Sequence, residues 1–241
     1  MALKTILYQG GEFEISYEIL NPTCSQNLII LHGWGSSKAL MNQAFSQSFK
    51  EFCHIYIDLP GFGNSKSPPF PLQTQDYAEI VKLILSQLDK KIDCVMGHSF
   101  GGKVGVLLNP STLILLSSAG IPKEKSLKIH FKIALSKTLN RICPPLSLAL
   151  KKILRSKDVE NMNEIMYQTF KNVVDEDFSN YFAHYNNLAL IFWGRQDTTT
   201  PLKSGEKIAT LIKKSHFYVL EGEHFFFLDK GKVIEELYHS L

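Results

Sequence analysis

The sequence predicts an α/β fold with a mostly parallel, doubly wound sheet of about eight strands and helices on both faces. Two observations lead to this prediction. Short apolar segments alternate with segments of helical periodicity along most of the 241 residues. Several apolar segments, such as 28–31 and 113–116, contain no polar residue, which is typical of parallel strands covered on both faces. The length is sufficient for one large domain with a substantial core.

The individual strands follow from apolar runs and turn residues. Gly10-Gly11 is a hairpin signal between the first two strands, and residues 12–19 alternate as a half-exposed strand does. Strands are expected at 4–8, 12–20, 28–31, 54–57, 94–96, 113–116, 188–193 and 216–220. Helices are expected at 39–50, at 74–88 with Thr74 as the cap, from the Gly-rich turn to Pro110, from Pro201 onward, and at 230–238.

The alternation stops between residues 121 and 187, where no strand pattern occurs and helices are expected at 126–140, 146–155 and 161–174. We therefore divide the chain into a core of 1–120 and 188–241 and a helical insertion of 121–187. Within 123–157, ten Lys and Arg residues accompany one acidic residue, a net charge of +9, whereas the whole chain carries +3. This charge is either a solvated basic face or a means of attracting an anionic substrate, lipid surface or partner.

A Gly-x-Ser-x-Gly pattern, Gly97 to Gly101, lies between an expected strand and an expected helix. This is the nucleophile-elbow pattern, in which the serine occupies a strained turn and the glycines remove side chains that would collide across it. The following helix directs its N-terminus at any developing negative charge. The alternative is a glycine-rich turn with an ordinary serine.

Three residue types needed for nucleophilic catalysis each follow an expected strand. They are Ser99, Asp197 and His224, and they occur in the chain order that the elbow architecture uses. The carboxyl ends of parallel strands meet at one edge of a sheet, so we expect these residues to form a catalytic triad. Alternatively, Asp197 caps the next helix and His224 is a surface-loop residue.

An oxyanion hole requires two backbone N–H groups. Phe100, directly after the serine, is expected to supply one, and Trp34, in the His32-Gly33-Trp34-Gly35 turn after strand 28–31, the other. Trp34 is also expected to cover a loop if its role is only structural.

These segments resemble the α/β-hydrolase fold superfamily over nearly the whole chain outside the insertion. The resemblance is carried by 32–35, 58–65, 97–102, 193–197 and 222–225. It implies that the insertion is a lid over the active site. Serine at the elbow differs from the aspartate of epoxide hydrolases and haloalkane dehalogenases.

The chain is also similar to the hydrolases that cleave carbon–carbon bonds of meta-cleavage products. Those enzymes usually carry Asn before the serine, Trp after the catalytic histidine and a different oxyanion turn. Here the corresponding residues are His98, Phe225 and Gly33-Trp34-Gly35, and these departures count against that substrate class.

The expected function is that of a serine hydrolase that cleaves a small acyl compound, a carboxylic ester or thioester, through an acyl-enzyme. Two alternatives are a carbon–carbon bond hydrolase of the meta-cleavage type and a hydrolase-fold ligand-binding or scaffold protein with little turnover. No cofactor and no metal are expected, because the four cysteines, Cys24, Cys53, Cys94 and Cys143, lack the spacing of a metal or redox motif.

The expected partner is a small-molecule substrate. The basic charge of the insertion favours an anionic one. The modest net charge is unlike that of a nucleic-acid-binding protein. No signal peptide or membrane span is recognised, so a cytoplasmic location is expected, with peripheral membrane contact through the insertion as an alternative. The sequence leaves the oligomeric state open.

Overall fold

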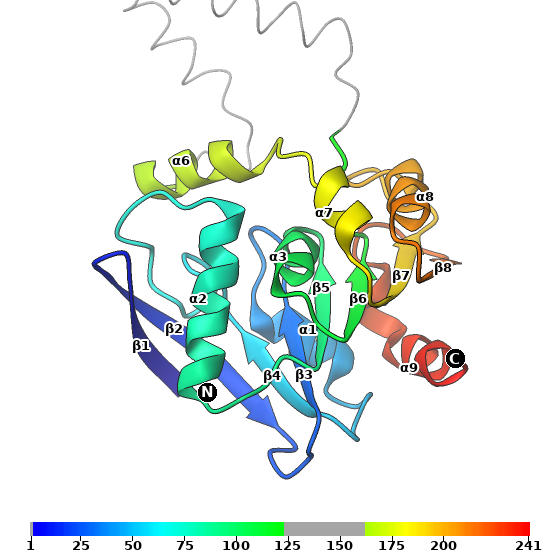
Figure 1. Ribbon diagram of the computed structural model, residues 1–241, viewed down its shortest axis with the longest axis horizontal. Coiled ribbons are helices and arrows are strands. Elements are labelled where there is room, and N and C mark those ends of the chain that lie inside the picture. Colours follow the sequence, from blue (N-terminus) through cyan, green and yellow to red (C-terminus); the bar gives the residue numbers. More distant parts are fainter. Residues whose placement is uncertain (1, 123–161) are drawn as a thin grey trace, which may run out of the picture.

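The structure is a computed structural model that describes residues 2–122 and 162–241. Its centre is a mixed sheet whose eight, mostly parallel strands agree with the predicted fold class (Figure 1). The strand order is β1-β2-β4-β3-β5-β6-β7-β8. The pairs β1–β2 and β2–β4 are antiparallel, and all other neighbouring strands are parallel. The strands are Ala2–Tyr8 (β1), Gly11–Leu20 (β2), Asn27–Leu31 (β3), Cys53–Ile57 (β4), Cys94–His98 (β5), Thr112–Leu116 (β6), Leu188–Gly194 (β7) and Ser215–Leu220 (β8).

Strand β3 illustrates why the sheet needs a helical layer on each face. All five of its residues are buried, and successive side chains point to opposite faces. Ile29 and Leu31 belong to one hydrophobic cluster, whereas Leu28 and Ile30 belong to the other. Both faces are therefore apolar and must be covered, which the crossover helices of a parallel sheet achieve.

One face packs against α2 (Thr74–Gln87), α3 (Phe100–Leu108) and α8 (Leu202–Leu211), which contribute Tyr77, Val104 and Ile208 to its cluster. The other face packs against α1 (Lys38–Phe45), the short 3₁₀ helix η2 (Phe226–Asp229) and α9 (Gly231–His239). This arrangement leaves the carboxyl ends of the parallel strands uncovered by these two layers, and the loops that carry the candidate site residues begin there.

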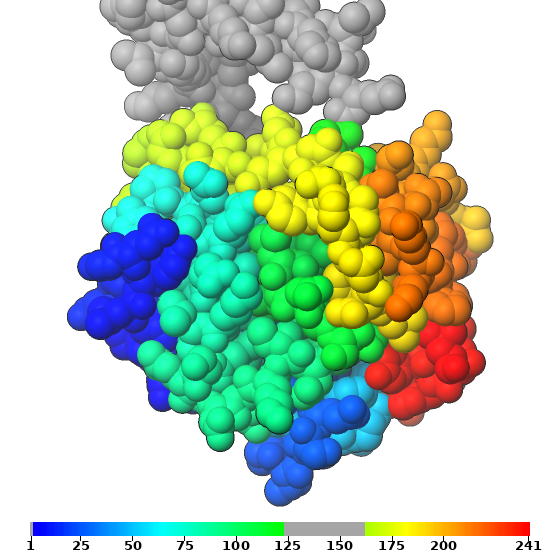
Figure 2. Space-filling view, viewed as in Figure 1, coloured from blue at the N-terminus to red at the C-terminus, as the bar shows by residue number. Residues whose placement is uncertain are grey.

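The described part of the predicted insertion, residues 162–187, lies at that edge. Helix α6 (Glu164–Val173) and the short helix α7 (Ser179–His184) border the molecule beside α2 and α8, in yellow-green and yellow in Figure 2. The Asn163 side chain accepts the Met166 N–H and begins α6 three residues later than the pattern at 161–174 predicts. The helices expected at 126–140 and 146–155, and the basic charge of 123–157, lie outside the described residues.

Two local predictions are wrong for reasons that involve distant contacts. Gln73, not Thr74, is the N-cap of α2 and forms a capping box with Asp76, while the Thr74 hydroxyl donates to Glu176. Helix α1 ends at Phe45 rather than at residue 50, before Phe49 adopts a left-handed φ of 54° and donates its N–H to Glu235. Helices α7 and η2 are not predicted, because they are too short to show a helical period.

Candidate active site

The backbone at Ser99 is strained. Ser99 has a φ of 50° and a ψ of −112° at the junction of β5 and α3, a conformation that a non-glycine residue adopts only where the surroundings impose it. A Cβ on Gly97 would lie 2.4 Å from the carbonyl oxygen of Gly101, so the first glycine of the pattern is required across the turn. The turn thus has the geometry that the Gly-x-Ser-x-Gly pattern predicts.

The second glycine of the pattern has another role. A Cβ on Gly101 would lie 2.5 Å from the carbonyl oxygen of Leu31, so the absence of a side chain lets the start of α3 approach the end of β3. Phe100 is the first residue of α3, and its N–H has no acceptor within the helix. This close packing places next to Ser99 an N–H of a helix N-terminus that has no backbone acceptor in the described part of the chain.

Asp197 and His224 meet at the carboxyl ends of β7 and β8. The Nδ1 atom of His224 lies 2.8 Å from Oδ2 of Asp197, whose side chain is 0% exposed. The other carboxylate oxygen, Oδ1, accepts the N–H groups of Thr199 and Thr200 at 2.8 and 2.9 Å. The cap of α8 is Pro201, so Asp197 holds the preceding turn rather than the helix itself.

The charge on Asp197 decides the form of the histidine ring. Burial raises the pKa of the carboxyl, but hydrogen bonds from His224 and the Thr200 N–H outweigh it and lower the pKa to about 2. An ionised carboxylate can only accept hydrogen bonds, so Nδ1 of His224 carries the proton. In a neutral imidazole, Nε2 then bears the lone pair that a general base needs.

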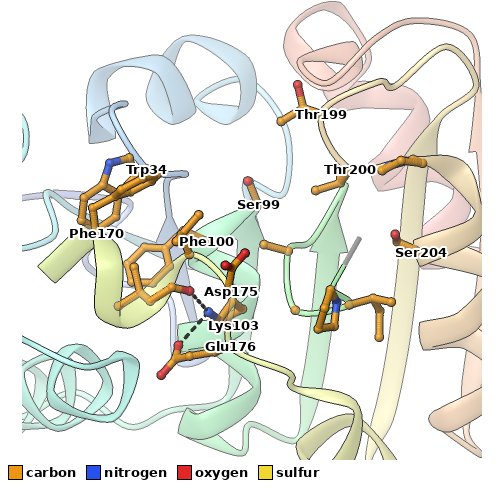
Figure 3. A pocket seen from close by; sticks show the side chains of 17 residues that line it. Trp34, Ser99, Phe100, Lys103, Phe170, Asp175, Glu176, Thr199, Thr200 and Ser204 are labelled. Atoms are coloured by element: carbon orange, nitrogen blue, oxygen red, sulfur yellow. Dashed lines mark hydrogen bonds and ion pairs between the residues drawn. The ribbon is translucent and has the colours of Figure 1, made fainter. Parts of the chain in front are cut away.

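A cavity of about 600 Å³ opens at Ser99. Figure 3 shows the Ser99 side chain between the aromatic rings of Trp34, Phe100 and Phe170 and the polar side chains of the β7–α8 loop and α8. The loop that contains Asp197 contributes Thr199, Thr200 and Pro201 to the wall. Ser99 and these three residues, which are at least 100 positions apart in the chain, thus border one cavity.

Trp34 forms part of the apolar wall. Its ring contacts Phe62, Phe100 and Phe170, with centroid distances of 4.8, 5.5 and 5.4 Å. Within residues 2–122 and 162–241, the Trp34 N–H donates to no backbone carbonyl. The expected covering role of the side chain and the expected oxyanion role of the N–H are therefore compatible.

Lys103 is an unexpected member of the cavity wall. Its side chain is 2% exposed, and Nζ donates to the carbonyl oxygen of Val173 at 2.6 Å and to Glu176 at 2.7 Å (Figure 3). Burial lowers the pKa of Lys103, although the Glu176 carboxylate opposes this shift. The pair joins α3, which begins at the serine turn, to the chain after α6.

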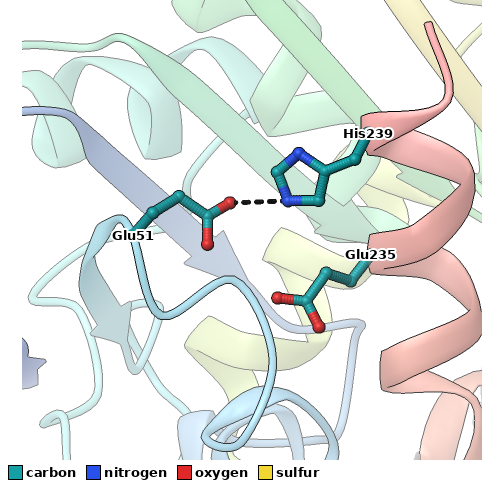
Figure 4. Close-up of side chains that lie close together, drawn as sticks. All are labelled: Glu51, Glu235 and His239. Atoms are coloured by element: carbon teal, nitrogen blue, oxygen red, sulfur yellow. Dashed lines mark ion pairs between the residues drawn. The ribbon is translucent and has the colours of Figure 1, made fainter.

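One group of described residues has metal-ligand geometry, and it lies away from Ser99. The ligand atoms of Glu51, Glu235 and His239 are within 4.8 Å of one another (Figure 4). His239 Nε2 lies 3.0 Å from Glu51, and Glu235 accepts the Phe49 N–H at 2.5 Å. Glu51 precedes the amino end of β4, so these contacts fasten α9 to the α1–β4 loop and do not involve the cavity.

The comparisons with known proteins decide the family. The sequence profile of the alpha/beta hydrolase family matches residues 28–236, which include strands β4 to β8, nearly all of β3, the serine turn and both carboxyl-end loops. The chain belongs to the alpha/beta hydrolase family. The resemblance stated from the motifs is thereby confirmed, and with it the fold class.

Two curated proteins are similar to this chain in sequence, at 25% and 33% identity over the aligned residues. An uncharacterized hydrolase, YugF of Bacillus subtilis, is 25% identical over 86% of this chain and 85% of its own. A pimeloyl-[acyl-carrier protein] methyl ester esterase of Pseudoalteromonas atlantica is 33% identical over 39% of this chain and 37% of its own. The second match thus covers little more than a third of either protein.

Solved structures confirm the fold. An esterase of Thermogutta terrifontis has a TM-score of 0.72 and 18% identity, with 100% of this chain and 97% of that chain covered. A meta-cleavage product hydrolase of Pseudomonas fluorescens has a TM-score of 0.71 and 17% identity, with 98% and 96% covered. Among the described residues of this hydrolase, no helix is both long and apolar enough to cross a membrane.

Three residues near the site make contacts that the sequence does not predict. Thr200 Oγ1 lies 2.8 Å from Asp197 Oδ2 and 3.3 Å from His224 Nδ1, and Lys103 holds the cavity wall. His98, which the sequence assigns to the turn motif alone, contacts the His224 loop. Lys103 lies in the helix expected after the serine turn, and its place among apolar residues is the signal that could have identified it.

Proposed function

We propose that this hydrolase cleaves carboxylic esters through a Ser99–His224–Asp197 triad and an acyl-enzyme. One observation carries the proposal. The 2.8 Å bond between His224 Nδ1 and Asp197 fixes the histidine tautomer at the same strand ends where strained Ser99 faces the cavity. A base with a free Nε2, an ionised partner and an exposed hydroxyl are the parts that nucleophilic acyl transfer requires.

The proposed reaction has two halves. His224 Nε2 takes the Ser99 hydroxyl proton while Oγ attacks the ester carbonyl, and the resulting imidazolium then protonates the departing alcohol. Water, deprotonated by His224 in turn, attacks the acyl-serine and releases the acid and the free serine. Asp197 stays ionised and stabilises the imidazolium in both halves, in accord with its lowered pKa.

Two backbone donors are proposed to bind the oxyanion. Among the described residues the Phe100 N–H, at the start of α3, and the Trp34 N–H, in the turn after β3, donate to no backbone carbonyl. Neither N–H group has to reorient during the reaction, because close packing at the glycines already fixes the backbone of both turns.

The cavity supports an ester with an apolar acyl or alcohol group. Trp34, Phe100, Phe170 and Val173 form much of its wall, and Lys103 is neutralised by Glu176 rather than available to a ligand. The match to a methyl ester esterase over 39% of this chain also supports an ester substrate. We propose in addition that the basic residues of 123–157 attract anionic substrates to the cavity.

A substrate panel tests this function. Neutral esters of increasing acyl length, matched thioesters and a dienoate ring-fission product are offered to the parent protein and to Ser99→Ala. The proposal expects ester hydrolysis with an initial burst of alcohol, because deacylation follows a covalent intermediate. Equal turnover by a folded Ser99→Ala protein, or cleavage of the dienoate alone, would contradict it.

A further inference from the structure

His98 lies between the two halves of the proposed machinery. Its Nε2 atom is 3.1 Å from the backbone carbonyl oxygen of His224, and the two imidazole rings have centroids 4.6 Å apart. The ring also contacts Phe225 and Phe227, at 5.1 and 4.7 Å. The residue before the candidate nucleophile therefore touches the loop that carries the candidate base.

The other side of the ring faces the oxyanion turn. A Cβ on Gly33 would lie 2.9 Å from His98 Nδ1 and 3.1 Å from the Ser99 Cβ. Glycine at 33 thus leaves room for the His98 ring. One imidazole fills the space between the turn of Trp34 and the loop of His224.

The hydrogen bonds define the tautomer of His98. Nδ1 is buried and has no hydrogen-bond partner within the described part of the chain, whereas Nε2 faces a carbonyl oxygen. A proton on Nδ1 would leave a buried N–H unpaired and set two acceptors against each other, so the proton belongs on Nε2. Burial lowers the pKa of His98 to about 3, with the nearby His224 adding to this shift, and the ring stays neutral.

We propose that His98 is a positioning residue: its Nε2–H bond to the His224 carbonyl fixes the backbone of the base and hence its alignment with Ser99. This inference rests on the proposed esterase function. It differs from a packing role, because packing needs only a ring of this size, whereas positioning needs a donor at the place of Nε2.

Three substitutions separate the donor from the bulk. His98→Gln carries an N–H donor three bonds from Cβ, as Nε2 is, whereas the donor of His98→Asn is two bonds away, as Nδ1 is. His98→Phe keeps a ring of similar size and has no donor. We expect His98→Asn and His98→Phe to lower kcat by about 10- to 100-fold with little change in KM, the range in which a small misplacement of a reacting group acts. We expect His98→Gln to recover most of kcat.

A second measurement reads the bond directly in the parent protein. In protein labelled with ¹⁵N-histidine, the ring nitrogen shifts and couplings should show His98 neutral with its proton on Nε2 from about pH 5 to about pH 8, where ordinary histidines titrate. This result does not depend on any variant folding or on any substrate.

The outcomes distinguish the positioning role of His98 from the proposed esterase function on which it rests. A folded His98→Phe protein with parental kcat, or equal loss in the Gln and Asn variants, overturns the positioning role while the triad stands. A proton on Nδ1, or titration of His98 near neutral pH, also overturns it. If the parent protein hydrolyses no ester and its Ser99 does not react with a fluorophosphonate, the proposed function falls, and the positioning role falls with it.

Discussion

The two sides of the cavity are constructed in different ways. The sheet side, with Ser99 and Phe100, is fixed by backbone: a strained turn, close glycine contacts and strand ends locked by the sheet. The α6 side, with Phe170 and Val173, is fixed by side chains. The Lys103–Glu176 pair holds it, the Asn172 amide donates to the Leu72 carbonyl, and the Thr169 hydroxyl accepts the Leu72 N–H. Chemistry should therefore depend on the first side and substrate fit on the second.

The largest effect should come from the sheet side. Asp197→Asn should leave KM similar and lower kcat by about 10⁴-fold, as in comparable triads, because an amide no longer holds the tautomer with a free Nε2. Steady-state kinetics on a short ester measure this. Glu223→Gln, a change of the same kind beside His224, serves as the control and should be near normal. A rate within a few-fold of the parent for Asp197→Asn would mean that another carboxylate orients the base.

The α6 side should respond in KM. Lys103→Met removes the cation that binds Val173 O and Glu176, leaves the mostly buried carboxylate with one partner fewer, and loosens the wall. We expect KM to rise several-fold, kcat to change less, and the melting temperature to fall. Lys103→Met with Glu176→Gln should recover part of the lost stability, because the unpaired charge is then gone.

Arg195→Met serves as the control for the pair. The Arg195–Glu221 pair is exposed on both sides, and exposed pairs contribute little to stability. A Lys103→Met protein with parental KM and a reduced kcat would contradict the division of roles between the two sides.

Acid should weaken the sheet side first. Desolvation lowers the pKa of His98 to about 3 and that of His32 to about 4, from 6.5, and also lowers the pKa of His54. Below pH 6.5 the unfolded chain then binds more protons than the folded one, so the free energy of unfolding decreases as the pH falls toward these values. Asp197, with its lowered pKa, adds to the loss only below 3.8.

Urea unfolding across this pH range checks the expectation. A decline that begins below pH 6.5 agrees with buried neutral histidines. A stability that stays constant until the carboxylates titrate would contradict it.

The smallest effect concerns substrate charge. If the basic residues of 123–157 attract anionic substrates, kcat/KM for an anionic ester should fall with salt more than for a neutral ester of matched acyl length, because the Debye length shrinks from about 10 Å at 0.1 M to about 3 Å at 1 M. Parallel salt curves would mean that the basic charge is a solvated face or serves a membrane or partner absent from the assay.

Much of the sheet was predictable because its signals are local. Apolar runs such as Leu28–Leu31 mark buried strands, and the glycine pattern around Ser99 marks the strained turn. Asp197 and His224 were placed at strand ends by the same local patterns. Their bond to each other, like the rest of the site, depends on which strands become neighbours.

The contacts that the sequence did not show are long-range. Lys103 meets Glu176 across 73 positions, and His98 meets the His224 carbonyl across 126. Thr74 looked like a cap because a hydroxyl at a helix start usually is one, but here Glu176 takes that hydroxyl and Gln73 caps instead. Tertiary contacts of this kind override the local preference for a helix cap, and the residue spacing of a single sequence does not predict them.

Covalent labelling tests directly whether Ser99 is a reactive nucleophile. The parent protein and Ser99→Ala are treated with a fluorophosphonate, followed by intact mass measurement and peptide mapping. Because Ser99 lies in a strained turn open to the cavity, we expect one phosphonyl group per chain, located on Ser99 and absent from a folded Ser99→Ala protein. A parent protein that remains unlabelled, or a label that persists in Ser99→Ala, would contradict it.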